Sequence, residues 1–382
     1  MLIKRPNRQK FPLSTFSIDH DAAGICTNDN FITKKPAHSK PTVPLEGQLK
    51  ACKMRANRFN ESRYMLLACL AIAAGLVVLV WSADRFVLGA AATARHFGMS
   101  PLLIGMTIVS LGTSAPEIFV SLSASFGGAG TLAIGNAIGS NIANIGLVLG
   151  ITALIAPLPI QSRMLKKEIP ILLLITVIAG LVLQDLTLDF WDGIILLSCL
   201  VVTLFWLFFE NSDQGTTGID EEESEAMDAL STKQSLFWLV VGLVALMVSA
   251  KVLVWGAVEV ARFFEISELI IGLTIVAIGT SLPELAASVT SALKGHHDIA
   301  IGNVVGSNIF NLLSVLPIPG LVIATQVDGS ALYRDYSTMF ILTLLLMAFL
   351  YGSRKAKRVG RRAGTILLLA YVSYLGLLLV QS

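Results

Sequence analysis

Charged residues are scarce in this sequence. Of its 382 residues, 14% are Asp, Glu, Lys or Arg, whereas 54% are hydrophobic. An ordinary soluble domain is roughly a quarter charged, so the composition argues against a water-soluble enzyme or binding domain. Apolar runs such as 65–83, 194–209 and 366–380 approach or reach the roughly 20 residues that cross a bilayer as a helix. The sequence therefore predicts an all-α integral membrane protein.

Sulfur ligands are also rare. The chain has four cysteines, and they show no metal-ligand spacing: Cys26, Cys52, Cys69 and Cys199. The sequence therefore predicts neither a disulfide framework nor a thiolate metal cluster. It indicates no cofactor, no nucleic-acid partner and no obligatory protein partner, so the expected partners are ions and the lipid bilayer.

The first 62 residues differ in composition from the rest. They are polar, rich in Lys, Asn, Thr and Pro, and without sustained periodicity, which predicts a disordered extension over residues 1–62. No apolar segment precedes a small-residue cleavage site, so this stretch does not read as a signal peptide. An alternative is that the protein begins at Met54 or Met65 and that the preceding residues are not part of it.

Apolar runs beyond residue 62 predict ten membrane-spanning helices. Their centres lie near residues 75, 113, 143, 177, 200, 246, 280, 311, 344 and 373. One substantial polar stretch, 210–233, separates the fifth run from the sixth and contains the acidic sequence DEEESE at 220–225. We predict that it is a solvated linker between two membrane regions, 65–209 and 234–382.

Two sequence blocks occur twice at one separation. GMTIVSLGTSAPE at 105–117 returns as GLTIVAIGTSLPE at 272–284, and AIGNAIGSNIANI at 133–145 returns as AIGNVVGSNIFNL at 300–312. Both pairs lie 167 positions apart, so the repeated unit is about five helices long. Because five is odd, the second copy enters the membrane from the opposite side. The sequence thus predicts two inverted five-helix repeats, which place a substrate site near the midplane.

Lys and Arg residues indicate the orientation, because they accumulate in short cytoplasmic loops. When the extension before Tyr64 is left out, one side of the ten-helix arrangement has only Arg262 and Arg334. The other side has Arg85, Arg95, Arg163, Lys166, Lys167, Lys233, Lys294, Arg354, Lys355, Lys357, Arg358, Arg361 and Arg362. The loop 210–233 is therefore predicted to be cytoplasmic and both chain ends to lie outside, in a plasma or inner membrane.

Glu117 and Glu284 are carboxylates inside otherwise apolar helices, where an isolated charge costs at least a few kcal/mol. Hydroxyl groups share a helix face with each of them: Thr113, Ser114, Ser121, Thr280, Ser281 and Ser288. Pro116 and Pro283 each remove a helical hydrogen bond and clash with the carbonyl four residues back. We expect the helices to bend there and to turn carbonyls toward a sheltered cavity. An alternative is a structural ion pair with Lys251.

The second block supplies amides and hydroxyls at a spacing of four, which places them on one helix stripe: Asn136, Ser140, Asn144, Asn303, Ser307 and Asn311. The intervening glycines allow close helix approach, so an alternative role for this block is helix packing. Two carboxylates with many oxygen ligands suit calcium or sodium and disfavour zinc, copper and magnesium. Competition of two ions for such ligands is a sufficient basis for antiport.

The motifs GTSAPE and GTSLPE, each followed by GN and GSN blocks, resemble the two alpha repeats of the sodium/calcium exchanger family. The resemblance is to the prokaryotic branch of the cation/calcium antiporter superfamily and runs from about residue 65 to the end. It implies that the second, third, seventh and eighth helices surround the ions. It also implies that the first and sixth helices slide to alternate access.

Carried over by position, the resemblance implies a specific ligand set. It makes Glu117 and Glu284 the principal ligands of calcium, joined by Thr113, Ser114, Thr280 and Ser281. It implies that Ser140 and Ser307 help to hold sodium, that Ser110 and Ala277 contribute backbone carbonyls, and that Asn144 and Asn311 occupy the remaining positions.

Sodium-driven calcium export by alternating access is the leading hypothesis, which makes the protein a secondary transporter and not an enzyme. One alternative is calcium/proton exchange, in which protonation of Glu117 and Glu284 replaces sodium. Another is potassium-dependent exchange, against which Asn311 counts because some family members carry aspartate there. A passive cation channel would conduct without a counter-ion, but inverted repeats with broken helices suit alternating access better.

Overall fold

The computed structural model describes the chain over residues 45–159, 164, 166–210, 230–266, 271–327, 329, 331–352 and 358–381. Residues up to Leu66 form one unit and Leu67–Ser382 form a second, compact unit. The first helix, α1 (Leu45–His96), includes residues 45–62, for which the sequence predicted no regular structure. Residues 1–44 and most of the loop 210–233 lie outside the described residues.

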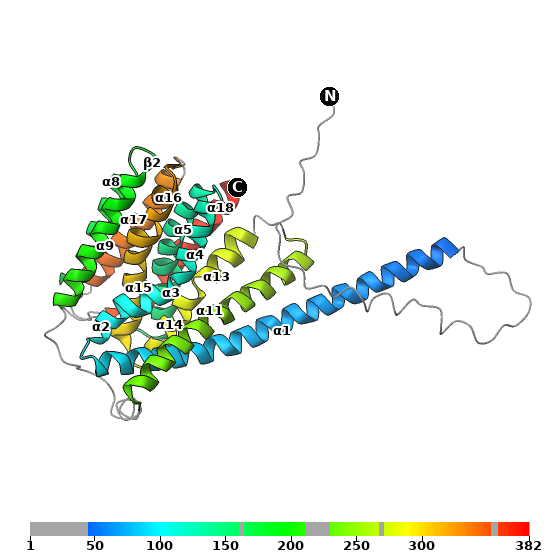
Figure 1. Ribbon diagram of the computed structural model, residues 1–382, viewed down its shortest axis with the longest axis horizontal. Coiled ribbons are helices and arrows are strands. Elements are labelled where there is room, and N and C mark those ends of the chain that lie inside the picture. The colour runs from blue at the N-terminus through cyan, green and yellow to red at the C-terminus, as the bar shows by residue number, and fades with distance from the viewer. Residues whose placement is uncertain are drawn as a thin grey trace, which may run out of the picture. The chain divides into compact units, whose positions relative to one another are not determined.

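Helices make up nearly all of the described structure (Figure 1). After α1, the first half contains α2 (Pro101–Ile104), η2 (Gly105–Val109), α3 (Ser110–Thr113), α4 (Ala115–Phe126), α5 (Gly130–Ala143), η3 (Asn144–Leu149), α6 (Gly150–Ile155), α8 (Glu168–Val182) and α9 (Phe190–Glu210). The second half contains α11 (Thr232–Phe263), η4 (Gly272–Val276), α13 (Ala277–Thr280), α14 (Leu282–Leu293), α15 (His297–Phe310), η5 (Asn311–Val315), α16 (Pro317–Val322), η6 (Ala331–Tyr336), α17 (Ser337–Gly352) and α18 (Arg361–Gln381). The elements labelled η are π-helical.

Within the described residues, seven helices are long and apolar enough to cross a membrane. They are Arg63–His96, Gly130–Ile155, Phe190–Phe209, Thr232–Phe263, His297–Val322, Leu332–Tyr351 and Arg361–Val380. Two further segments are helix pairs bent by 42° and 53°, Pro101–Thr113 with Ala115–Phe126 and Thr274–Thr280 with Leu282–Leu293. The shorter α8 is also apolar. Each predicted helix centre falls in one of these segments, and the chain is a helical, multi-pass membrane protein.

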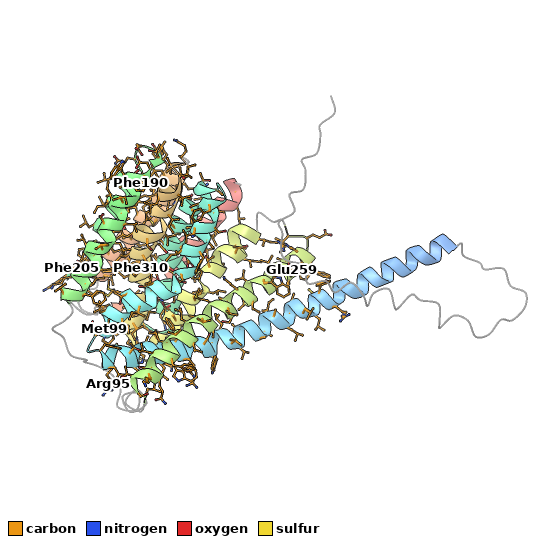
Figure 2. The ribbon with its side chains drawn as sticks, viewed as in Figure 1. Arg95, Met99, Phe190, Phe205, Glu259 and Phe310 are labelled. Atoms are coloured by element: carbon orange, nitrogen blue, oxygen red, sulfur yellow. The ribbon has the colours of Figure 1, made fainter. Side chains whose placement is uncertain are left out.

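Two of the long spans form the centre of the bundle. The most apolar window of His297–Val322 is 94% buried and that of Gly130–Ile155 is 78% buried, against 22–28% for the other five. Phe310 of α15 is 3% exposed, whereas Phe205 of α9 is 63% exposed on the outside of the bundle (Figure 2). Peripheral helices thus present large apolar side chains outward, as a lipid-facing surface requires, while α5 and α15 form the interior.

The sequence duplication is reproduced in the local structure. Each element from η2 to α6 begins 167 residues before its counterpart in the series from η4 to α16. The helices α1 and α11, which end 167 residues apart, lie against each other at four glycines. A Cβ atom at Gly75 would lie 3.0 Å from Leu253, and one at Gly242 would lie 2.6 Å from the backbone of Phe86. Residue numbers therefore rise along α1 as they fall along α11, so the two equivalent helices are antiparallel.

Short strands connect the two halves. The strand β1 (Leu158–Pro159) pairs in antiparallel fashion with β4 (Arg358–Val359), and β2 (Thr187–Leu188) pairs with β3 (Thr325–Gln326). Each pair takes one strand from each half, and β1 and β3 are themselves 167 residues apart. Loops of the two halves are therefore hydrogen-bonded to each other, in addition to the packing between their helices.

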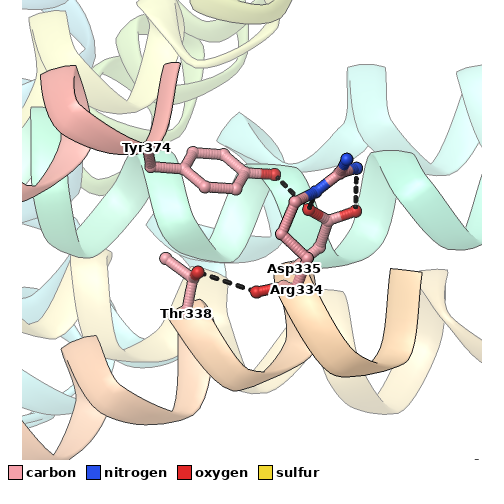
Figure 3. Close-up of polar contacts among 4 residues, drawn as sticks. All are labelled: Arg334, Asp335, Thr338 and Tyr374. Atoms are coloured by element: carbon pink, nitrogen blue, oxygen red, sulfur yellow. Dashed lines mark hydrogen bonds and ion pairs between the residues drawn. The ribbon is translucent and has the colours of Figure 1, made fainter. Parts of the chain in front are cut away.

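A polar cluster fixes the start of α17 against α18 (Figure 3). Arg334 donates from Nε and Nη2 to the two carboxylate oxygens of Asp335, at 2.6 and 3.0 Å. The hydroxyl of Tyr374 donates to Oδ1 of Asp335 at 3.0 Å, and that of Thr338 donates to the carbonyl of Arg334 at 2.7 Å. The carboxylate of Asp335 is therefore satisfied within this cluster.

Candidate ion-binding site

The helices that carry the two glutamates are broken one turn before them. Between α3 and α4, Ser114 has φ −82° and ψ 3°, and between α13 and α14, Ser281 has φ −89° and ψ 5°. Pro116 and Pro283 lie in the first turn of the new helix, where a missing N–H costs nothing. The predicted bend is confirmed, and Glu117 and Glu284 each lie in the first turn of a helix, where the helix dipole favours an anion.

π-helical turns accompany both motifs, and nothing in the sequence predicted them. The turns η2 and η4 directly precede Ser110 and Ala277, and η3 and η5 begin at Asn144 and Asn311. A π-turn is rare and displaces backbone carbonyls from the regular ladder, which is why such turns are frequent at functional sites. The four π-turns lie at equivalent positions in the two halves, so they are part of the structural repeat.

The predicted ligands are almost all inside the protein. Glu117 and Glu284 are each 1% exposed. Also buried are Ser110, Thr113, Ser114, Ser140, Asn144, Ser281, Ser307 and Asn311, whereas Thr280 is half-buried. The side chain of Ala277 lies outside the described residues. The carbonyl of Ser110 accepts the N–H of Ser114 at 2.9 Å and the hydroxyl of Thr113 at 3.4 Å.

The two halves meet at these residues. The hydroxyl of Ser114 donates to Oε1 of Glu284 at 3.2 Å, across 170 positions of sequence. The turn that begins with Asn144 packs on α14, the helix of Glu284, and the turn that begins with Asn311 packs on α4, the helix of Glu117. The turn that carries each asparagine thus packs on the glutamate helix of the other half, which brings the predicted ligands of both halves together.

Several oxygen atoms of these predicted ligands have no hydrogen-bond partner among the described residues. They are Oε2 of Glu117, Oε2 of Glu284, the amide oxygens of Asn144 and Asn311, and the hydroxyls of Ser281 and Ser307. A buried polar atom without a partner costs about 1–3 kcal/mol. A cation coordinated by these oxygens removes that cost, so the residues fit a hard, oxygen-liganded cation.

Clusters of the side chains that bind zinc or copper are absent from the described part of the chain. Within the described ranges, no three His, Cys, Asp or Glu side chains gather closely enough to hold a metal ion. Lys251, the base that could have paired with the glutamates, is exposed on α11. The candidate site that remains is the one predicted from the sequence, with two carboxylates, hydroxyls and amides.

Asn136 and Asn303 have a role that the sequence did not reveal. Each donates from Nδ2 to the backbone carbonyl of the glutamate in its own half, at 3.2 Å for Glu117 and 3.3 Å for Glu284. The sequence groups both asparagines with the other predicted ion ligands, because they share a helix stripe at a spacing of four. The only available signal was that each lies 19 residues after its glutamate, the same in both repeats.

Comparisons with known proteins identify the family of the chain. The family of the sodium/calcium exchanger protein matches residues 67–209 and 234–380. CaxA of Alkalimonas amylolytica, whose name describes it as a candidate antiporter, is 44% identical over 81% of this chain and 98% of its own length. The sodium/calcium exchanger MaX1 of Methanosarcina acetivorans is 31% identical over 79% of this chain and 95% of its own.

A solved structure has the same fold. The sodium-calcium exchanger NCX_Mj, soaked without sodium and calcium, superposes with a TM-score of 0.71 at 34% identity and covers 82% of this chain and 99% of its own. The matches include both halves of the chain and both copies of the motif that carries the buried glutamates. The chain therefore belongs to the sodium/calcium exchanger family.

Proposed function

We propose that this cation/calcium antiporter exchanges sodium for calcium by alternating access and exports calcium from the cell. The observation that carries the proposal is the set of buried oxygen atoms around Glu117 and Glu284, which come from both halves and lack hydrogen-bond partners among the described residues. Two formal negative charges balance one calcium ion. The same flexible oxygens can instead hold sodium ions, so the two ions compete for the site.

In the proposed ligand set, Glu117 and Glu284 bind calcium with Thr113, Ser114, Thr280 and Ser281. Ser140 and Ser307 help to bind sodium. Asn144 and Asn311 occupy the remaining ligand positions, and Ser110 and Ala277 contribute their backbone carbonyls. Asn311 places an uncharged amide where a carboxylate would add a third negative charge. The chain's own residues thus favour exchange driven by sodium without potassium.

The proposed topology has ten crossings in two inverted halves, 65–209 and 234–382. Inversion is supported by the antiparallel α1 and α11, whose glycines meet residues of the equivalent helix. The distribution of Lys and Arg supports a cytoplasmic 210–233 loop, with both chain ends outside. In the proposed mechanism the first and sixth helices, α1 and α11, slide past a site near the midplane to alternate access.

A flux assay with the purified protein in liposomes tests the function. Radioactive calcium uptake is measured with an outward sodium gradient, and then with a potassium or a proton gradient alone, against liposomes containing the Glu117→Gln/Glu284→Gln protein. We expect uptake with sodium only. Uptake that ignores sodium and follows the proton gradient would replace the proposal by calcium/proton exchange, and uptake without any counter-ion would indicate a channel.

A further inference from the structure

The glycine of each GTS motif leaves a notch that a side chain of α11 fills. A Cβ atom at Gly112, on α3, would lie 2.8 Å from Cδ2 and 3.1 Å from Cδ1 of Leu243. A Cβ atom at Gly279, on α13, would overlap Cγ2 of Val254 and lie 3.2 Å from its Cγ1. Two residues of one helix, the notch residues Leu243 and Val254, thus contact glycines that are 167 positions apart in the sequence.

Each of these glycines lies immediately before the first predicted ligands of its half. The residues after Gly112 are Thr113 and Ser114. Their hydroxyls donate to Asn303 at 3.1 Å and to Glu284 at 3.2 Å, both in the second repeat. The second motif has the same order of glycine, threonine and serine. The helix α11 therefore contacts the chain directly beside the groups that we propose as ligands.

The helix breaks make these contacts important for the geometry of the site. Pro116 has no N–H to donate to the carbonyl of Gly112, and Pro283 has none for that of Gly279. The two segments are bent there by 42° and 53°. Because each bend lacks a hydrogen bond that a continuous helix would have, packing has a larger share in holding it. At each motif glycine the packing partner is α11.

The helix α11 cannot yield easily at either notch, because α1 supports it at the same two levels. Gly242 and Leu253 directly precede the two notch residues. A Cβ atom at Gly242 would lie 2.6 Å from the backbone nitrogen of Phe86, and one at Gly75 of α1 would lie 3.0 Å from Leu253. A clash at either notch is therefore not relieved by a shift of α11 toward α1.

From these contacts we propose that Leu243 and Val254 are positioning residues for the calcium site. Each fills the notch of one motif glycine and holds the broken helix there, so that one helix sets the place of the first ligands in both halves. Their aliphatic side chains offer no oxygen and act only through the glycines. The inference rests on the proposed calcium site at Glu117 and Glu284.

Paired substitutions test the first notch. Gly112→Ala places a methyl group against Leu243 and should weaken calcium binding by about 10–100-fold, the cost of disturbing a group that orients a metal ligand. Leu243→Ala removes the opposing atoms, so the double variant Gly112→Ala/Leu243→Ala should bind calcium within about 3-fold of the wild type, as expected for two coupled positions. Equilibrium binding of radioactive calcium to the purified protein, without sodium, measures the affinity.

The second notch supplies the matched pair. Gly279→Ala should weaken calcium binding in the same way, and Val254→Ala should restore it. The crossed variants Gly112→Ala/Val254→Ala and Gly279→Ala/Leu243→Ala should bind calcium no better than the glycine variants alone. If a glycine variant does not fold, Leu243→Ala and Val254→Ala leave the notches empty, and each should weaken binding by about 5-fold or more.

A glycine–leucine contact outside the two motifs is the control. A Cβ atom at Gly193 of α9 would lie 2.6 Å from Cγ of Leu321 on α16. Gly193→Ala should lower the midpoint of thermal unfolding, because it creates a similar clash, and Leu321→Ala should restore it. The calcium affinity should stay unchanged in both variants. This control separates a positioning role at the motif glycines from packing alone.

The inference is overturned if the Gly112 and Gly279 variants keep the calcium affinity of the wild type. It is also overturned if the crossed partner restores binding as well as the matched partner, or if Gly193→Ala weakens binding equally. Sodium-driven flux of the wild type with unchanged affinities in the glycine variants leaves the proposed function standing and removes the role of the notch residues. Matched restoration of calcium binding, with flux that ignores sodium, supports the inference and rejects sodium as the counter-ion.

Discussion

The two repeats carry the same residues in different surroundings. In the second repeat α15 is packed on η2, and Gly302 and Gly306 have no room for a side chain. Ser114 of the first repeat donates to Oε1 of Glu284 at 3.2 Å, whereas the hydroxyl of Ser281, its equivalent, has no hydrogen-bond partner among the described residues. The residue types are duplicated but this contact is not, so the difference lies in how the helices of the two repeats pack. The predictions below test where the repeats are equivalent and where they are not.

The largest effect is expected where the repeats are equivalent. Glu117→Gln and Glu284→Gln should each reduce exchange by about 100-fold or more, since loss of a partner one shell further out already costs roughly 10–100-fold in metal affinity. Sodium-driven calcium flux of the purified variants measures this. Glu259→Gln is the control, because Glu259 is partly exposed and pairs with Arg262 at 2.8 Å. Normal flux in either site variant would remove its glutamate from the site.

The glycines of α15 should be sensitive to any side chain. A Cβ atom at Gly306 would lie 2.5 Å from the hydroxyl oxygen of Ser110 and 2.6 Å from the carbonyl oxygen of Met106, so Gly306→Ala should lower the free energy of unfolding by about 1–3 kcal/mol. Thermal unfolding of the purified protein measures this. Gly376→Ala on α18 is the control, because a Cβ atom there meets nothing within 4 Å among the described residues, and it should not lower stability. Equal stability of the two variants would show that α15 is not closely packed at Gly306.

A pH effect is expected in the second repeat alone. Burial, assisted by Lys294 and His297, lowers the pKa of His296 to about 4, whereas the first repeat has Ala129 at this place. The folded protein keeps His296 neutral while the unfolded chain protonates it below about pH 6.5, so stability is lost as the pH falls toward 4. We expect a loss of about 1–2 kcal/mol between pH 7 and 5.

Thermal unfolding of the wild type and His296→Ala at both pH values measures the effect. The alanine variant lacks the titrating group and should lose less stability on acidification, although it creates a small cavity that lowers stability equally at both pH values. An unchanged pH dependence in the variant would contradict the assignment.

The smallest effect concerns an ion pair that one repeat lacks. Nζ of Lys294, at the end of α14, lies 2.6 Å from Oδ1 of Asp84 on α1, and both are partly exposed. The equivalent positions are Gly127 and Lys251, which cannot form this pair. Lys294→Asp should lower the free energy of unfolding by at most about 1 kcal/mol, less in high salt. The exchanged pair Asp84→Lys/Lys294→Asp should restore most of it, and no recovery would show that the contact is not electrostatic.

The bends and the contact between the two motifs were predictable because they follow from residue chemistry and from the repeat. Pro116 and Pro283 break a helix wherever they occur in its interior, and Glu117 and Glu284 need oxygen partners at membrane depth. The 167-residue offset added that both motifs serve one site. The π-turns at Asn144 and Asn311 were not predictable, since no residue type specifies an i to i+5 hydrogen bond.

The difference between the repeats could not come from sequence either. Thr113 and Thr280 occupy identical motifs, so local chemistry assigns them the same partners. Ser114 and Ser281 also occupy identical motifs, and only the packing of the helices decides that Ser114 reaches Glu284 while the hydroxyl of Ser281 has no hydrogen-bond partner among the described residues. The short strands were also missed, because two-residue pairs such as Leu158 with Val359 carry no periodicity.

The central claim is that the two repeats build one calcium site and not two. Equilibrium binding of radioactive calcium to the purified protein, without sodium, tests this most directly. We expect one calcium ion per chain in the wild type and none at the same calcium concentration in either Glu117→Gln or Glu284→Gln. Two ions per chain in the wild type, with one remaining in each single variant, would contradict the account.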